Sequence, residues 1–198
     1  MIKEIKPTVF VVDDDTAVRD SLRMLLKSVG LPVEVFESGQ EFLDADRDDR
    51  PGCLVLDIRM PGMSGLELQV KLNERHSILP IIFITGHGDV PMAVEAMQAG
   101  AVDFIQKPFR DQDLLDRINQ ALEKDAGSRR MLAERNMIRK RLESLTPREK
   151  EVLDLVVAGK ANKVIAGDLN LSQRTVEIHR ARVMEKMEAH SLAHLVRM

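Results

Sequence analysis

Five short apolar runs alternate with five stretches of helical character through the first 124 residues, and this alternation constrains the fold more than any other feature. The apolar runs are Thr8–Val12, Val33–Phe36, Cys53–Leu56, Pro80–Thr85 and Val102–Gln106. The helical stretches lie near 16–29, 38–45, 64–75, 90–99 and 111–124. Strands that alternate with helices of this length form βαβ units. The pattern predicts an α/β domain, residues 1–124, with a doubly wound five-stranded parallel sheet that helices cover on both faces.

Local signals mark where several of these helices begin and end. Ser38-Gly39-Gln40-Glu41 and Ser64-Gly65-Leu66-Glu67 have the residue types of a capping box, in which serine and glutamate satisfy each other's backbone N–H groups. Gly30 and Gly100 stand where helix C-caps belong.

The alternation stops after residue 124, and residues 125–143 are highly charged. Met131, Ile138, Leu142 and Leu145 form one narrow apolar stripe, as in a short seam between two helices. We interpret the segment as a helical linker that Gly127 and Ser128 break or kink away from the preceding helix. A solvated connector is an equally open alternative.

Residues 144–198 predict a small all-α domain of four helices. Thr146-Pro147-Arg148-Glu149 is a capping box with proline at the first helical position, and it opens a helix that runs to about Ala158. The later helices are expected to be capped by Asn162, Ser172 and Ser191, with ends near Leu169 and Met187. Because three residues join the second helix to the third, the segment predicts a helix-turn-helix bundle.

Charge and composition indicate the kinds of partner and the cellular location of the protein. The net charge of −3 hides 14 Lys/Arg against 22 Asp/Glu in residues 1–124, 6 against 3 in 125–143, and 9 against 7 in 144–198. An acidic front and a mildly basic back indicate different partners for the two halves. The single cysteine, and the lack of any apolar run near the roughly 18 residues of a membrane span, predict a cytoplasmic protein without membrane contact.

Polar residues gather at the carboxyl ends of four predicted strands. Asp13-Asp14-Asp15 follows the first, Asp57 ends the third, Thr85 ends the fourth and Lys107 follows the fifth. In an open α/β sheet these ends converge on one crevice. Carboxylates gathered there would raise each other's pKa values, and a hard divalent cation such as Mg²⁺ would relieve the repulsion.

This set of groups suits phosphoryl transfer. A carboxylate beside Mg²⁺, a hydroxyl and an ammonium can attack a phosphoryl group and hold its charge. We predict Asp57 as the nucleophile, because the turn at Met60-Pro61-Gly62 would leave it exposed, with Thr85 and Lys107 as donors to the phosphoryl oxygens. Taken alone, the Asp triplet could simply cap the following helix.

Residues 8–124 resemble the receiver domain of bacterial two-component response regulators, a flavodoxin-like fold. The motifs are Val11-Val12-Asp13-Asp14-Asp15, Leu56-Asp57-Ile58-Arg59-Met60-Pro61-Gly62-Met63-Ser64-Gly65, Ile84-Thr85-Gly86 and Asp103-Phe104-Ile105-Gln106-Lys107-Pro108-Phe109. The resemblance implies that Asp57 is the phosphoacceptor. It implies that Asp14, Asp57 and the Arg59 carbonyl bind Mg²⁺ (or Mn²⁺), with Asp13 nearby or acting through water.

The same resemblance implies a cis Lys107–Pro108 peptide and a switch formed by Thr85 and Phe104. Many receivers have tyrosine at the latter position, and phenylalanine cannot donate a hydrogen bond. It also implies a sensor histidine kinase as phosphoryl donor, and no enzymatic activity beyond the receiver's own Mg²⁺-dependent phosphorylation and dephosphorylation.

Residues 145–198 resemble the LuxR-type helix-turn-helix, especially its FixJ-like subgroup. The motifs are Leu145-Thr146-Pro147-Arg148-Glu149, Asn162-Lys163-Val164-Ile165-Ala166 and Ser172-Gln173-Arg174-Thr175-Val176-Glu177-Ile178-His179. The resemblance implies binding to double-stranded promoter DNA and RNA polymerase as a further partner.

Within the helix over 173–187, Val176, Val183 and Met187 form one stripe that should pack on the bundle. On the other faces, we expect Glu177, Ile178 and Ala181 to meet base edges. We expect phosphate contacts from Lys163, Arg174, Thr175, Arg182 and Lys186.

The sequence therefore predicts a DNA-binding response regulator that forms a homodimer when phosphorylated. The surface of residues 90–110, with apolar Val90, Met92 and Val94, is the expected receiver interface, and Leu192, Leu195 and Val196 could pair the second domains. An aspartyl-phosphate phosphatase would want Asp-x-Asp where Asp57 is followed by Ile58 and Arg59. A phosphorylation-gated module whose helical tail contacts only protein stays open as an alternative.

Overall fold

The computed structural model describes residues 6–45, 50–86 and 90–198. The chain divides into two compact units, Met1–Arg130 and Met131–Met198. Each unit has a hydrophobic core of its own.

The first unit is built on a five-stranded parallel sheet in the order β2-β1-β3-β4-β5. The strands are β1 Thr8–Val12, β2 Val33–Phe36, β3 Gly52–Asp57, β4 Ile81–Thr85 and β5 Asp103–Gln106. This confirms the doubly wound α/β prediction. Strands β1, β3 and β4 are buried along their whole length, as expected of continuous apolar runs with helices on both faces.

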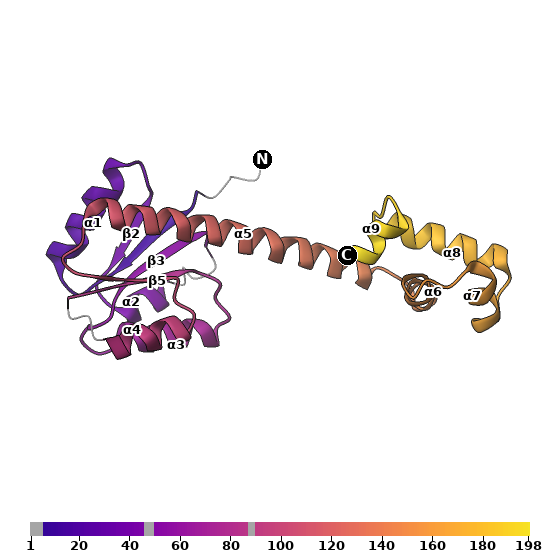
Figure 1. Ribbon diagram of the computed structural model, residues 1–198, viewed down its shortest axis with the longest axis horizontal. Helices are drawn as coiled ribbons and strands as arrows, with labels where there is room; N and C mark the ends of the chain where they lie inside the picture. The colour runs from indigo at the N-terminus through magenta and orange to yellow at the C-terminus, as the bar shows by residue number, and fades with distance from the viewer. Residues whose placement is uncertain (1–5, 46–49, 87–89) are drawn as a thin grey trace. The chain divides into compact units, whose positions relative to one another are not determined.

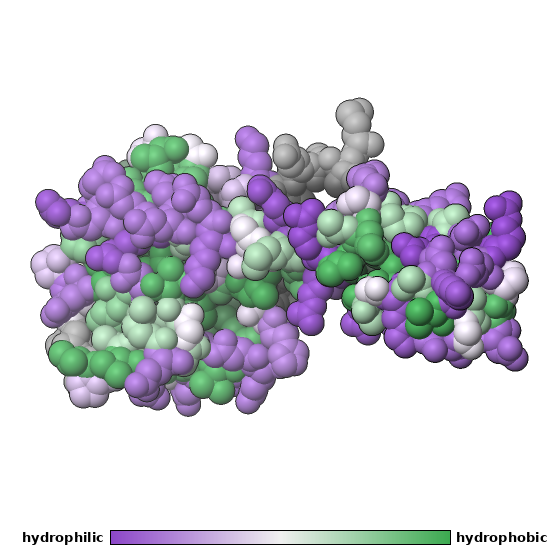
Figure 2. All heavy atoms as spheres, turned by 45° about the vertical axis from the view of Figure 1, so that its right-hand side comes forward, coloured by the Kyte–Doolittle hydropathy of each residue, from purple (hydrophilic) through white to green (hydrophobic). Residues whose placement is uncertain are grey.

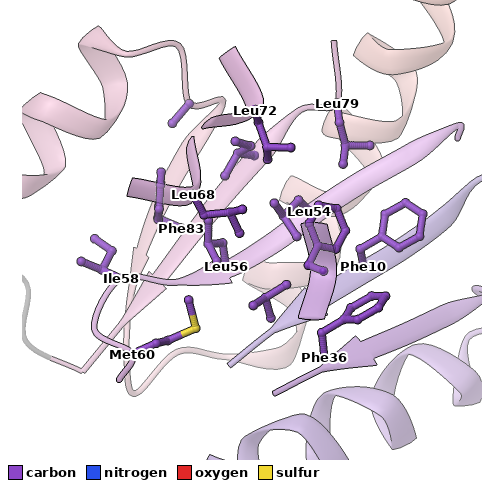
Figure 3. Close-up of a cluster of buried hydrophobic side chains, with 14 of the residues drawn as sticks. Phe10, Phe36, Leu54, Leu56, Ile58, Met60, Leu68, Leu72, Leu79 and Phe83 are labelled. Carbon is purple, nitrogen blue, oxygen red and sulfur yellow. The ribbon is translucent and has the colours of Figure 1, made fainter. Parts of the chain in front are cut away.

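Helices cover the two faces of this sheet (Figure 1). They are α1 Thr16–Ser28, α2 Gly39–Asp44, α3 Gly65–Glu74, α4 Val90–Gln98 and α5 Asp111–Glu143. Leu68 and Leu72 of α3 belong to the core on one face, together with Phe10 and Phe83 from the sheet (Figure 3). On the other face, α1 and α5 enclose a second core around Ile84. The sheet is therefore fixed on both sides, which holds its carboxyl edge in place.

The two predicted capping boxes differ. At Ser64 the box is complete, because the serine side chain accepts from Glu67 N and the glutamate carboxylate accepts from Ser64 N. At Ser38 only half of it forms. Glu41 N donates to the Ser38 hydroxyl, but the Glu41 carboxylate accepts from Glu37 N, one residue earlier than predicted.

Helix α5 runs without interruption through Gly127 and Ser128, so the predicted break there is wrong. A helical glycine costs only about 1 kcal/mol relative to alanine, and ionic contacts flank it. The buried Asp125 carboxylate accepts from Gly52 N at 2.9 Å, and Arg129 binds both Asp125 and, at 2.5 Å, the Arg50 carbonyl. These bonds place Asp125–Arg130 in the first unit, six residues beyond the expected end at residue 124.

The second unit contains the end of α5 and four further helices. They are α6 Pro147–Val157, α7 Asn162–Asp168, α8 Gln173–Lys186 and α9 Leu192–Arg197. Thr146, Ser172 and Ser191 cap as predicted, but α7 begins after Ala161, which makes no side-chain cap. Asn162 is instead the first helical residue, and its Oδ1 accepts from Arg180 at 2.7 Å.

Only part of the predicted apolar stripe of the linker is packed. Leu145 is buried in the core of the second unit and Ile138 packs against that core, whereas Met131 and Leu142 are exposed.

Figure 2 shows hydrophilic and apolar side chains interspersed on the face that it draws. Among the residues that the structure describes, no helix is both long and apolar enough to cross a membrane.

Candidate functional site

An acidic site lies at the carboxyl edge of the sheet. Asp13 follows β1, Asp57 is the last residue of β3, and Lys107 follows β5. The Lys107 ammonium donates to Asp13 Oδ2 at 2.7 Å and to Asp57 Oδ1 at 2.9 Å. The structure thus joins residues that lie 94 and 50 positions apart in the sequence.

Asp57 is buried, with 7% of its surface accessible, so the prediction that the following turn exposes it is wrong. Both of its oxygens are covered, because Oδ1 accepts from Lys107 and Oδ2 accepts from Arg59 N at 2.7 Å. Burial raises the pKa of Asp57, and the charge of Asp13 raises it further, against the lowering effect of Lys107. The sequence predicted that neighbouring carboxylates would raise the pKa of Asp57. The charge of Asp13 does so, but burial of Asp57 has the larger effect.

The pKa of Lys107 is raised as well, but for a different reason. Burial would lower the pKa of its ammonium, but the hydrogen bonds to Asp13 and Asp57 outweigh burial and raise it. The lysine therefore stays charged between two carboxylates that compete for it. One cation for two acids leaves a site that can attract a second cation.

The three successive aspartates have different surroundings. Asp13 is buried, and its Oδ1 accepts from Asp15 N at 2.9 Å, whereas Asp14 and Asp15 are exposed. Asp15 caps α1 by accepting from Ala17 N at 2.8 Å, so the capping alternative is correct for this residue. The Arg19 guanidinium of α1 donates to the carbonyls of both Asp13 and Asp14, a contact that the sequence reading missed.

Thr85 and Phe104 lie on the neighbouring strands. Thr85 is the last residue of β4, is buried, and accepts through its backbone carbonyl from Lys107 N at 2.7 Å. Phe104 in β5 is half-buried and packs against the core on the α3 face. The Lys107–Pro108 peptide is cis, as the resemblance implied.

The donor chemistry of this edge fits Mg²⁺. Within residues 6–45, 50–86 and 90–198, no group of three or more His, Cys, Asp or Glu side chains is arranged to hold a metal ion. Mg²⁺ commonly takes only one or two protein carboxylates and completes its shell with water and phosphate oxygens. Asp13 and Asp57, which lie close enough to share one ammonium, satisfy that requirement.

The second unit presents a polar helix face. Arg174, Glu177, Ile178, Ala181 and Arg182 of α8 are exposed, whereas Val176 and Val183 are buried in the core and confirm the predicted stripe. The face carries two arginines, one glutamate, one apolar side chain and one small residue. These are the group types that read base edges and phosphates.

The other predicted phosphate contacts differ in exposure and in the bonds they already form. Lys163 on α7 is exposed, and the half-buried Thr175 shares a hydrogen bond of 2.8 Å with the Ser172 hydroxyl. Lys186 belongs to the fold of its own unit, because its ammonium donates to the buried Glu149 carboxylate at 2.6 Å and to the Ser144 carbonyl at 3.3 Å. The predicted contact of Lys186 with a DNA phosphate would compete with these bonds.

Comparisons with known proteins agree with both units. Residues 9–119 match the family model described as "Response regulator receiver domain", and residues 143–198 match "Bacterial regulatory proteins, luxR family". The chain belongs to the two-component response regulators of the FixJ type. This regulator pairs a receiver domain with a LuxR-type DNA-binding domain.

Individual relatives match along nearly the whole regulator. It is 52% identical over 191 residues to "Transcriptional regulatory protein FixJ" of Rhizobium meliloti, covering 96% of this chain and 94% of the relative. It is 50% identical over 193 residues to "Nodulation protein W" of Bradyrhizobium diazoefficiens, covering 98% and 85%. The solved structure of "Response Regulator StyR" is similar at a TM-score of 0.90 and 50% identity, with 97% of each chain covered.

Proposed function

We propose that a sensor histidine kinase phosphorylates this response regulator on Asp57, and that phosphorylation promotes dimerisation and binding to promoter DNA in the cytoplasm. The observation that carries the proposal is the Lys107 ammonium held between Asp13 and Asp57 at the carboxyl edge of the sheet. Phosphorylation places negative charge on Asp57 next to that ammonium, which can donate to the new oxygens. Asp13 remains available for a metal ion.

Mg²⁺, or Mn²⁺, when bound, would neutralise charge on the transferring phosphoryl group. We assign its binding to Asp14, Asp57 and the Arg59 carbonyl, with Asp13 nearby or acting through water. Asp13 stays oriented through its bonds to Asp15 N and Lys107. Thr85, at the end of β4, is assigned as a second donor to the phosphoryl oxygens. Phe104 on β5 is assigned as the switch residue that changes position when Thr85 moves toward the phosphoryl group.

The test is incubation of the full chain with a small acyl phosphate and Mg²⁺, followed by intact mass. We expect one added phosphoryl group, no addition to Asp57→Asn, and no addition in the presence of a chelator. Asp20→Asn, which removes an exposed carboxylate of α1, is the matched control and should label normally. Undiminished labelling of Asp57→Asn would contradict the assignment of the phosphoacceptor.

Dimerisation is assigned to the α4 surface of the receiver. Val90 and Val94 are 74% and 49% exposed, more apolar surface than a helix of this size needs for its own packing. In α9, Leu192 and Val196 are exposed and available for pairing, but Leu195 is buried in the core, so it is removed from the predicted set. Sedimentation should show a larger species after phosphorylation, and an unchanged monomer at tens of micromolar, with and without DNA, would contradict the assignment.

On DNA, we assign Glu177, Ile178 and Ala181 to base edges and the flanking cations to phosphates. Glu177→Ala should relax specificity at one base pair by roughly 1–3 kcal/mol. Arg182→Ala should weaken all sites alike and lower the salt slope by about one unit. The test is to measure binding of both variants to a library of single-base-pair changes at several salt concentrations. The assignment would be wrong if Arg182→Ala changed the preferred sequence while Glu177→Ala weakened all sites alike.

The assignment of phosphate contacts covers Lys163, Arg174, Thr175 and Arg182. RNA polymerase is the expected downstream partner at a promoter.

The competing possibility, a helical tail that contacts protein alone, predicts no salt-dependent mobility shift with duplex DNA. A shift whose affinity falls with salt would exclude it.

A further inference from the structure

We infer that Arg19 is a positioning residue for the metal site, because it sets the direction of the Asp14 carboxylate. The inference rests on the proposed function, in which Asp14 is a metal ligand. Arg19 Nη1 donates to the Asp13 carbonyl at 2.7 Å and to the Asp14 carbonyl at 2.8 Å, and Nη2 donates to the Thr16 hydroxyl at 3.0 Å. One guanidinium thus binds two carbonyls of the loop between β1 and α1 and the hydroxyl of the first residue of α1.

The two carbonyls belong to the peptide planes on either side of the Asp14 Cα atom. Fixing both planes fixes φ and ψ of Asp14, and hence the direction in which its Cβ leaves the backbone. Asp13 does not need this help, because its carboxylate is bound by Lys107 and Asp15 N. In the part of the chain that the structure describes, no hydrogen bond holds the exposed Asp14 carboxylate, so its aim depends on its backbone.

The place of Arg19 in the helix supports a role beyond helix stability. It is the fourth residue of α1, where the helix dipole disfavours a cation, and the first turn of α1 contains no acidic residue. The guanidinium reaches back past the helix start instead of forming an ion pair along the helix. Arg23, one turn later, makes the ordinary contact, an exposed pair with Asp20 at 3.2 Å.

The sign of the effect separates positioning from charge. Removing a cation near a metal site should, by charge alone, strengthen Mg²⁺ binding. Removing a group that orients a ligand should weaken it, and changes to such supporting groups typically cost roughly 10–100-fold in metal affinity. Arg19→Ala is therefore expected to weaken Mg²⁺ binding by about ten-fold.

The experiment is calorimetric titration of the unphosphorylated full chain with Mg²⁺, repeated with Mn²⁺. Arg23→Ala removes the same charge from the same helix and should stay within about two-fold of the wild type. Arg19→Lys keeps the charge but offers only one nitrogen, so it should be intermediate. In acyl-phosphate labelling, the Mg²⁺ concentration at half-maximal rate should rise about ten-fold for Arg19→Ala, with the rate at saturating Mg²⁺ retained.

The outcomes are distinct. Mg²⁺ binding to Arg19→Ala that equals or exceeds binding to the wild type overturns the inference and leaves the proposed function standing. A wild type that binds no Mg²⁺ overturns both. If Arg19→Ala does not give the wild-type circular dichroism spectrum, Arg19→Lys carries the test, and wild-type affinity in that variant overturns the role of the second carbonyl bond.

Discussion

The two units each contain a buried carboxylate bound by a lysine, and the two pairs behave in opposite ways. In the receiver, Lys107 binds Asp57 at 2.9 Å and the pKa of Asp57 is raised. In the DNA-binding unit, Lys186 binds Glu149 at 2.6 Å and the pKa of Glu149 falls to about 2. Each lysine favours the charged form of its acid, but at Asp57 burial outweighs the lysine, whereas at Glu149 the lysine and the backbone donor outweigh burial.

The surroundings explain the difference. Asp57 ends the central strand β3, where burial dominates, and it shares its lysine with Asp13. Glu149 has Lys186 to itself, and it also accepts from Thr146 N at 2.9 Å within the capping box. Both acids accept from one lysine and one backbone N–H, but only Asp57 has a second carboxylate, Asp13, on the same lysine. The comparison teaches that a lysine alone does not set the pKa of a carboxylate, because burial and a second acid raise it at Asp57 whereas additional donors lower it at Glu149.

The largest expected effect is on phosphorylation. Lys107→Ala removes a charged donor from the reacting oxygens and should slow labelling by an acyl phosphate roughly 10–100-fold, the kinetic equivalent of one charged hydrogen bond. Lys186→Ala removes the matching lysine of the other pair and should leave the rate unchanged. Rates from intact mass against time measure both, and equal slowing by the two variants would break the comparison.

The next effect is on the stability of the DNA-binding unit. Glu149→Gln should lower its free energy of unfolding by roughly 1.5–3 kcal/mol, because Lys186 loses its carboxylate partner and the capping box loses its charge. Hydrogen exchange of peptides from α6 and α8 should accelerate, while peptides from β3 stay as in the wild type. Unaltered exchange in α6 would show that the pair is not structural.

A smaller effect of the opposite sign is expected at Asp57. Asp57→Asn removes a carboxylate that burial and Asp13 both destabilise, so it should raise the stability of the receiver by roughly 0.5–2 kcal/mol. Exchange of the slowest amides in β1 and β3, measured without Mg²⁺, reports the change. A destabilised receiver in this variant would mean that Lys107 outweighs the cost of burial.

The sequence predicted most of the fold and the members of the acidic site for identifiable reasons. Apolar runs and helix caps are local signals, so strands and helix starts such as Ser64 and Thr146 could be located to within a residue or two. The convergence of Asp13, Asp57 and Lys107 followed from parallel topology, because strand ends of a parallel sheet meet at one edge.

Features that depend on long-range contacts could not be predicted. The continuity of α5 past Gly127 depends on Asp125 binding Gly52, 73 residues away in the sequence. The burial of Asp57 and the capture of Lys186 by Glu149, across 37 residues, arise from tertiary packing in the same way. The role of Arg19 had only a weak signal, a lone cation in the first turns of a helix.

The pH dependence of stability should separate the two pairs. The pKa of Glu149 is lowered, so its contribution is present above its ordinary value of 4.5 and is lost as the pH falls toward about 2. The pKa of Asp57 is raised above its ordinary value of 3.8, so its ionisation opposes folding. The receiver should therefore gain stability from this group as the pH falls through the raised pKa, with no further gain below 3.8.

The most direct test of the comparison is a carbon NMR titration of the side-chain carboxyl groups in the full chain without Mg²⁺. Asp57→Asn and Glu149→Gln assign the two resonances by their disappearance. We expect Asp57 to titrate above 3.8 and Glu149 at about 2. An Asp57 that titrates at or below 3.8, or a Glu149 that titrates near 4.5, would contradict the claim that the two lysine–carboxylate pairs are built for opposite purposes.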